Sequence, residues 1–300
     1  MGARASGVLA ALVLVACGGG GASSPPVDAG LTWDPQLVVD RPYPSKVPPG
    51  YDPATPTPLV LALHGLGDGG VNFATGFGLL GLADQRGFLV AYPDGSPTGF
   101  GGGYWNANDV CCQLSSPRPD DVAYLAAVIG DMSKRYHVDP HRVFVVGLSN
   151  GGMMAHRLAC DLAPWVAAVL SVSGAQWTDA TRCQPAQPVA VLELHGDADT
   201  TVPYQGGRTL GGSGPAVNSA HDTIAVWVAR DGCQPTADTT AAPVDLDGSL
   251  AGAETTVERW PGCRPGGAAE LWTVHGGQHV PRLRPGVPGL LYDWLVAHAR

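Results

Sequence analysis

The sequence predicts an α/β fold in which a mostly parallel sheet carries helices on both faces. Of its 300 residues, 45% are hydrophobic and only 14% are charged, so the chain can bury the core of one large domain. Short apolar runs rich in β-branched residues alternate along the chain with longer helix-forming segments. This alternation is typical of parallel strands joined by right-handed crossovers.

The expected strands are short and apolar, as buried parallel strands should be. They cover residues 59–63, 88–92, 142–146, 167–172, 189–194 and 271–274. The clearest helix is 120–136, whose apolar residues recur with a 3.6-residue period behind acidic first-turn residues. Further helices are expected around 218–230 and 287–298. Residues 234–256, rich in Ala, Thr, Pro and Asp, are expected to form an exposed excursion rather than a second domain.

Residues 147–151 form a G-x-S-x-G pentapeptide between the strand 142–146 and a helix-forming run. A tight strand-to-helix turn projects the hydroxyl of Ser149 above the sheet edge, and Gly147 and Gly151 lack the Cβ atoms that would clash across it. This is the context of a nucleophile elbow, which makes Ser149 the candidate nucleophile. The alternative is a glycine-rich turn with an ordinary polar serine.

A serine hydroxyl needs a base to remove its proton, and the base needs an acid to orient it. Both partners are expected in loops at the carboxyl ends of the strands. One strand runs into a loop that contains Asp197 and Asp199, and a later strand runs into a loop that contains His275 and His279. The chain order Ser, Asp, His is that of an α/β-hydrolase. The order by itself leaves either aspartate as the acid and either histidine as the base.

Three motifs are more specific than this general pattern. They are V-D-P-H-R-V at 138–143, G-L-S-N-G-G-M at 147–153 and H-G-x-x-D-x-x-V-P-Y at 195–204. Together they resemble the family of secreted polyhydroxybutyrate depolymerases and feruloyl esterases, and the resemblance extends from about residue 59 to residue 279, including the segments 104–106, 111–112 and 120–122. It implies an α/β-hydrolase fold with Ser149 as the nucleophile, Asp199 as the acid and His279 as the base, without a metal or an organic cofactor.

The negative charge of a tetrahedral intermediate needs two hydrogen-bond donors. The candidates are the backbone N–H groups of Leu66, in a glycine-rich loop, and of Asn150, next to the nucleophile. The resemblance also assigns Trp105 to a wall of the substrate site, although a lone tryptophan fits the core equally well. The family usually has His-x-Trp-Pro-Gly where this chain has H-V-P-R at 279–282. One aromatic wall is therefore missing, which leaves the substrate preference open.

The first 17 residues are predicted to be an export signal. A single early charge, Arg4, precedes the apolar run 8–16, which is too short to span a bilayer. The sequence L-V-A-C that ends at Cys17 resembles the lipobox of bacterial lipoproteins, in which the cysteine is lipidated. The alternative is an ordinary cleavage site close to this cysteine. Residues 18–34 are predicted to be a flexible tether, and 35–300 the catalytic domain.

Six cysteines remain after Cys17, namely Cys111, Cys112, Cys160, Cys183, Cys233 and Cys263. An even number in an exported chain favours disulfides over metal ligands, and the set lacks the C-x-x-C spacing of a zinc site. Six cysteines allow 15 pairings, so the connectivity stays open. Cys233 and Cys263 flank the most irregular region, where a disulfide would close a loop of large entropy.

The net charge of −9 and the scarcity of Lys and Arg runs exclude a nucleic-acid partner, because phosphate binding needs clustered cations. We therefore expect an exported, lipid-anchored serine esterase that meets a membrane only through its anchor. Its expected substrates are hydroxyalkanoate polyesters or oligomers, or feruloyl and acetyl esters of plant polysaccharide. Two alternatives remain: a dipeptidyl peptidase-like serine hydrolase, and an inactive polymer-binding surface lipoprotein.

Overall fold

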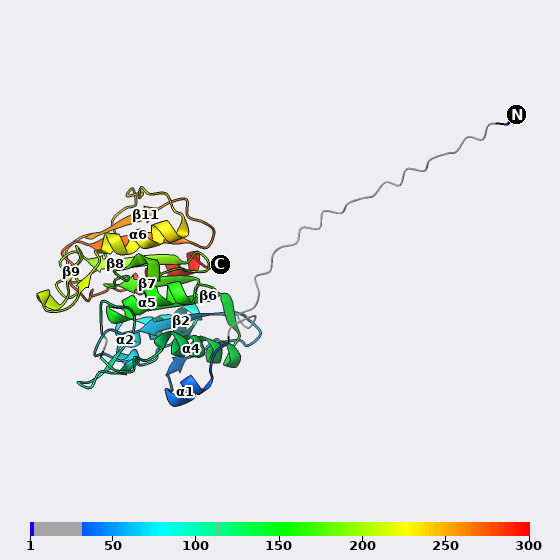
Figure 1. Cartoon of the computed structure of the whole chain (residues 1–300), viewed down its shortest axis with the longest axis horizontal. Helices are drawn as coiled ribbons and strands as arrows, with labels where there is room; N and C mark the ends of the chain where they lie inside the picture. Colours follow the sequence, from blue (N-terminus) through cyan, green and yellow to red (C-terminus); the bar gives the residue numbers. More distant parts are fainter. Residues whose placement is uncertain (3–31, 113) are drawn as a thin grey trace.

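The computed structural model describes residues 1–2, 32–112 and 114–300 of the chain. The predicted export signal from residue 3 onward, including Cys17, and the predicted tether as far as residue 31 lie outside the described residues. Within the described ranges, no helix is both long enough and apolar enough to cross a membrane. Figure 1 shows the layered body that forms around a central sheet.

The central sheet has eight strands in the order β1-β3-β2-β6-β7-β8-β12-β11. The parallel strands are β2 (Thr57–Leu63), β3 (Leu89–Ala91), β6 (Val138–Leu148), β7 (Ala168–Val172), β8 (Ala190–Gly196) and β12 (Ala268–Val274). The two edge strands, β1 (Ser45–Lys46) and β11 (Thr255–Trp260), are antiparallel to their neighbours. All the predicted strands are present, and the mostly parallel α/β-hydrolase fold is confirmed.

Helices cover both faces of the sheet, which is why its inner strands are apolar on both sides. In β2, Leu59 and Leu61 belong to one apolar cluster, whereas Val60 and Ala62 belong to the cluster on the opposite face. The first cluster is covered by α4 (Asp121–Arg135), α5 (Asn150–Asp161) and α6 (Ala220–Asp231), which lie across one face in Figure 1. The second is covered by α2 (Gly70–Gly76), α3 (Leu79–Arg86) and α7 (Val287–Ala297).

Several short elements lie outside the central sheet and its covering helices. They are the helix α1 (Gln36–Asp40), the 3₁₀ turns η1 (Ala180–Arg182) and η2 (Leu210–Gly212), and the strands β4 (Ser96–Pro97), β5 (Gly103–Tyr104), β9 (Gly207–Arg208) and β10 (Ala216–Val217). Strands β4 and β5 pair with each other, as do β9 and β10. The pair β4–β5 lies next to the loop after β2, because Gly67 N–H donates to the Gly103 carbonyl at 2.8 Å.

The segment predicted as an excursion lies along the outer edge of the sheet. Asp238 pairs with Arg259 and Val244 with Thr255 as isolated bridges, so the chain after α6 follows the edge strand β11. The sequence analysis did not identify β11 as a strand. Of its residues T-T-V-E-R-W only Thr255 and Val257 are buried, and two of the others are charged, so the apolar run that marks an inner strand is missing.

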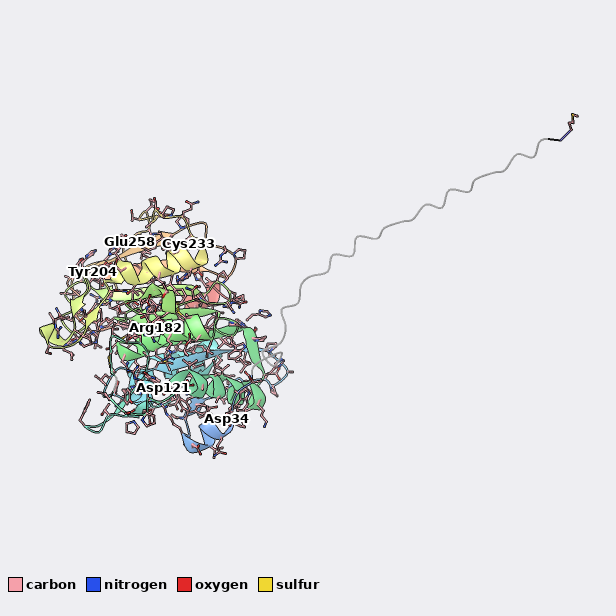
Figure 2. The ribbon with its side chains drawn as sticks, in the orientation of Figure 1. Asp34, Asp121, Arg182, Tyr204, Cys233 and Glu258 are labelled. Carbon is pink, nitrogen blue, oxygen red and sulfur yellow. A yellow bond between two sulfur atoms is a disulfide. The ribbon has the colours of Figure 1, made fainter. Side chains whose placement is uncertain are left out.

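Three disulfides join the six cysteines of the described residues. Cys160 at the end of α5 pairs with Cys183, and Cys111 pairs with its neighbour Cys112. Cys233, which follows α6 and is labelled in Figure 2, pairs with Cys263 in the loop between β11 and β12. The last pair is the one that the loop-entropy argument favoured.

Candidate active site

Ser149 occupies the sharp turn between β6 and α5. Its φ of 56° and ψ of −118° are unusual for a residue other than glycine and are typical of a strained strand-to-helix elbow. A Cβ atom on Gly147 would collide with the Gly151 carbonyl oxygen, and one on Gly151 would collide with the Leu63 carbonyl oxygen. The two glycines are therefore required by close backbone approach, as the pentapeptide predicted.

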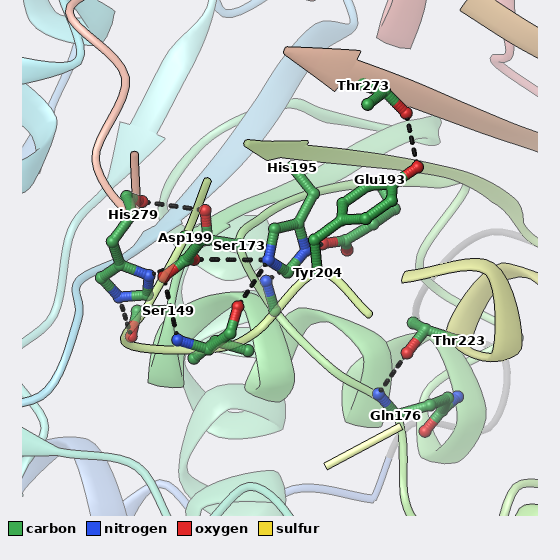
Figure 3. Close-up of polar contacts among 12 residues, drawn as sticks. Ser149, Ser173, Gln176, Glu193, His195, Asp199, Tyr204, Thr223, Thr273 and His279 are labelled. Carbon is green, nitrogen blue, oxygen red and sulfur yellow. Dashed lines mark hydrogen bonds and ion pairs between the residues drawn. The ribbon is translucent and has the colours of Figure 1, made fainter. Parts of the chain in front are cut away.

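Two loops from other strands bring an imidazole and a carboxylate to this serine. The Nε2 atom of His279, after β12, lies 2.9 Å from Ser149 Oγ, and its Nδ1 atom lies 2.6 Å from Asp199 Oδ2, after β8. Figure 3 shows the three side chains in one hydrogen-bonded series. Because an ionised carboxylate only accepts, Nδ1 carries the proton, and Nε2 is left as an acceptor for the serine hydroxyl.

The carboxylate of Asp199 has no exposed side-chain surface and is held by several donors. Its Oδ1 atom accepts from the backbone N–H groups of Thr201, at 2.7 Å, and Val202, at 3.0 Å. Burial of Asp199 by itself raises the pKa, but hydrogen bonds from His195 and His279 outweigh that cost and hold the pKa well below its usual range. The group is thus ionised over the whole range in which an imidazole titrates.

Asp197 and His275, the two alternatives, pair with each other instead. Asp197 Oδ2 lies 2.9 Å from His275 Nδ1, and its Oδ1 atom accepts from Gly276 N–H at 2.7 Å. About half of the His275 side chain is exposed, and neither residue has a hydrogen bond to Ser149 within the described part of the chain. The two aspartates and two histidines that the sequence left open thus form two separate pairs, His279–Asp199 and His275–Asp197.

Leu66 and Asn150 lie where backbone donors could face the serine. A Cβ atom on Gly65 would be 3.5 Å from Ser149 Cβ, so the loop after β2 passes directly against the nucleophile. Asn150 is the first residue of α5, where an N–H group has no acceptor within the helix. Among the described residues, neither the Leu66 nor the Asn150 N–H has a hydrogen-bond partner. Both groups are free to donate to a bound oxyanion.

The structure contradicts the prediction that Trp105 forms a wall of the substrate site. Its side chain is fully buried, and its indole N–H donates to the His64 carbonyl at 3.0 Å. The Asn150 side chain forms two hydrogen bonds with the backbone of Trp105. Its Oδ1 atom accepts from Trp105 N–H at 2.6 Å, and its Nδ2 atom donates to the Trp105 carbonyl at 2.9 Å. Trp105 cannot contact a substrate, because every face of the ring is covered; it joins the elbow to the loop that carries Leu66.

A cavity of about 190 Å³ lies close to the elbow, where Leu148 forms part of its wall, and was not predicted from the sequence. It is lined by Asp68, Asn72, Phe73, Gly76, Phe77, Leu148, Val280, Pro281 and Leu283. Leu148 directly precedes Ser149, and Val280 directly follows His279, so the cavity is lined by the chain neighbours of both reactive residues. The signal that could have located it is the H-V-P-R departure, since Val280 and Pro281, which stand where the family's tryptophan is expected, both line the cavity.

Comparison with known proteins places the chain among esterases. The family model described as esterase PHB depolymerase matches residues 42–199. NocK of Nocardia uniformis subsp. tsuyamanensis, whose name describes it provisionally as an esterase, is 32% identical over 85% of this chain and 75% of its own length. Feruloyl esterase B of Piromyces equi is 26% identical over 78% of this chain, which spans only 42% of that enzyme.

The solved structures include an acetyl xylan esterase from Aspergillus awamori with a TM-score of 0.60 and 16% sequence identity. The match covers 84% of this chain and 93% of that one. At this identity the likeness is one of fold, in agreement with the sheet order described above.

Proposed function

This chain belongs to the esterase PHB depolymerase family, and from that premise we propose that it is an exported serine esterase that hydrolyses carboxylic esters through an acyl-enzyme. The observation that carries the proposal is the series Ser149–His279–Asp199, in which a strained serine, an imidazole and a buried carboxylate are joined by hydrogen bonds of 2.9 Å and 2.6 Å. This is the geometry that a nucleophile, its base and an orienting acid require.

In the proposed mechanism Ser149 Oγ attacks the ester carbonyl carbon while its proton passes to His279 Nε2. The carbonyl oxygen becomes an oxyanion, which accepts hydrogen bonds from the Leu66 and Asn150 N–H groups. The intermediate collapses as the C–O bond to the alcohol breaks, and the alcohol leaves with the proton of His279. Water, activated by the same imidazole, then attacks the acyl carbon, releases the carboxylic acid and restores Ser149. Asp199 stays ionised throughout and stabilises the imidazolium.

The proposed substrates are esters with an uncharged acyl group of limited size: hydroxyalkanoate polyesters or oligomers, or feruloyl and acetyl esters of plant polysaccharide. The family and the names of the compared proteins support this range. The cavity that Leu148 shares with Val280 supports it too, because Phe73, Phe77 and Leu148 give it apolar walls. The carboxylate of Asp68 in the same lining disfavours an anionic acyl group.

A fluorophosphonate probe tests the mechanism, because it reacts with an activated serine. We expect labelling of the wild type and none of Ser149→Ala at an unchanged melting temperature. An unlabelled but folded wild type would mark a binding protein and not an enzyme. Turnover of p-nitrophenyl butyrate, methyl ferulate and polyhydroxybutyrate then ranks the substrates, and cleavage of a dipeptide nitroanilide in their place would indicate a peptidase.

Export and lipid anchoring complete the proposal. The three disulfides support an oxidising compartment, and the L-V-A-C sequence supports lipidation of Cys17, which lies outside the described residues. Cys17→Ser should release the protein from membranes or block its maturation, measured by detergent partition. A wild-type protein that is wholly soluble after cleavage at another bond would contradict the anchor.

A further inference from the structure

A second charged series lies behind the proposed catalytic residues and takes no part in the reaction described above. Glu193 and His195 point from β8 into the interior, and their side chains are 0% and 1% exposed. His156 of α5 joins them, also fully buried. Figure 3 shows Glu193 and His195 on the side of Asp199 that faces away from His279. Three fully buried ionisable side chains need a specific set of partners to offset their desolvation.

Both ring nitrogens of His195 face acceptors. Its Nε2 atom lies 2.9 Å from the Val202 carbonyl oxygen and 3.3 Å from Asp199 Oδ2, and its Nδ1 atom lies 3.0 Å from Glu193 Oε1. A carbonyl oxygen cannot donate, so Nε2 must carry a hydrogen. The charge of the ring then depends on Nδ1, and hence on whether Glu193 is ionised.

The surroundings of Glu193 favour its ionised form. Trp227 Nε1, which can only donate, lies 3.0 Å from His156 Nδ1, so the hydrogen of neutral His156 is on Nε2 and points to Glu193 Oε2 at 3.0 Å. Gly174 N–H donates to Oε1 at 3.1 Å. Two N–H groups, those of His156 and Gly174, thus donate to Glu193 whatever the state of His195, and such donors favour the carboxylate over the carboxylic acid.

The pKa directions agree with this assignment. Burial raises the pKa of Glu193, but the hydrogen bonds from His156 and His195 outweigh it, and the net shift is downward. Burial lowers the pKa of His195, but its hydrogen bonds to Asp199 and Glu193 outweigh that effect and raise the pKa to about 9. At neutral pH, His195 is then an imidazolium between two carboxylates.

We propose that His195 is a buried imidazolium that positions Asp199 and, through this shared carboxylate, sets the pH range in which His279 acts as a base. The proposal rests on the proposed esterase function. Asp199 Oδ2 is the common acceptor of both imidazoles, at 2.6 Å from His279 and 3.3 Å from His195. A positive charge on the far side of Asp199 stabilises the carboxylate and opposes a second proton on His279, which keeps that base neutral to lower pH.

The remaining groups around His195 do not supply a competing charge. From the loop after β8, the Tyr204 ring contacts it edge-on at 5.6 Å, and burial raises the pKa of this phenol, so it stays neutral. From β12, the register partner is Thr273, whose hydroxyl binds Tyr204 at 2.7 Å. From α5, His156 reaches the series only through Glu193. Hence Glu193 and Asp199 are the charges that face His195.

The pH dependence of kcat/KM tests the proposal, measured on methyl ferulate between pH 4.5 and 9 in the full-length protein. His195→Gln leaves Glu193 and Asp199 without the cation between them, so the apparent pKa of the acid limb should rise by about one unit. Glu193→Gln removes the carboxylate on which the Nδ1 hydrogen of His195 depends, so His195 becomes neutral and that pKa should rise, but by less than in His195→Gln, because the negative charge of Glu193 is lost as well. The double variant, which removes both charges, should fall between wild type and His195→Gln.

His275→Gln is the matched control, because His275 forms a comparable pair with Asp197 at 2.9 Å outside the series that ends at Ser149. Its acid limb should coincide with that of the wild type. If His195→Gln lowers kcat/KM equally at all pH values with the acid limb unmoved, His195 is only a packing residue and the proposal is overturned.

A measurement on the wild type avoids any dependence on the folding of the variants. In ¹⁵N-histidine-labelled protein at pH 7, both nitrogens of His195 should give protonated imidazolium signals, with loss of one proton only near pH 9. A neutral His195 at pH 7 overturns the proposal even where the enzyme is active. A wild type that neither hydrolyses esters nor reacts with the fluorophosphonate overturns the proposed function itself, which is a distinguishable result.

Discussion

Replacing Asp199 by asparagine should damage catalysis far more than the same change at Asp197, two residues earlier. Asp199 accepts from two backbone N–H groups through Oδ1 and from His279 and His195 through Oδ2. An asparagine that keeps its oxygen on the backbone donors turns its NH₂ group toward His279 Nδ1. The imidazole must then expose Nδ1 as an acceptor and carry its hydrogen on Nε2, where it can no longer accept the serine proton.

The magnitude follows from that change of tautomer. A wrong tautomer in a comparable triad costs on the order of 10³- to 10⁴-fold in turnover, or about 4–5.5 kcal/mol. Asp197 pairs with His275, whose side chain is 51% exposed, and such a surface pair contributes about 0–1 kcal/mol. Asp197→Asn also keeps an oxygen for Gly276 N–H. Its kcat/KM should therefore stay within about fivefold of the wild type.

The assay is p-nitrophenyl acetate hydrolysis at pH 7.5 on purified variants, with melting temperatures measured in parallel to show that both are folded. Equal losses at the two positions in folded proteins would refute the assignment of Asp199 as the orienting acid. An active Asp199→Asn variant would refute the role of the carboxylate altogether.

Three further predictions concern stability and specificity. Burial raises the pKa of Asp231, at the end of α6, to about 7, whereas the unfolded carboxyl ionises near 3.8, so the free energy of unfolding falls as the pH rises between these values. Asp231→Asn should therefore stabilise the protein by up to about 4 kcal/mol at pH 8 and by little at pH 4. Equal shifts of the melting temperature at the two pH values would contradict this. Trp105→Ala should lower the free energy of unfolding, measured by chemical denaturation, by about 3–5 kcal/mol, since the indole is fully buried. A near-normal denaturation midpoint with an altered substrate preference would instead show that Trp105 contacts the substrate. Val280→Trp should narrow the 190 Å³ cavity and lower kcat/KM for p-nitrophenyl butyrate about tenfold relative to the acetate, and an unchanged ratio would mean that the acyl group binds elsewhere.

The inner sheet and the position of the nucleophile could both be predicted from local sequence patterns. Apolar runs identify strands locally, because a strand covered by helices on both faces needs apolar side chains at successive positions. The elbow is equally local: the glycines at 147 and 151 are required by backbone contacts within the turn and with β2. The edge strand β11 escaped detection because one of its faces is partly solvated, which removes the continuous apolar signal.

Which of the candidate side chains contact one another depends on how distant loops pack in the folded protein. His279 binds a serine 130 residues away and an aspartate 80 residues away, and the spacing of His275 and Asp197 would have allowed the same contacts. The burial of Trp105 and the Glu193–His195 series likewise depend on elements that converge from distant parts of the chain. A motif shows which side chains a loop contains, but the direction in which each side chain points depends on how the loops pack against one another. Packing therefore divided the two aspartates and two histidines into one buried pair joined to Ser149 and one exposed pair beside it.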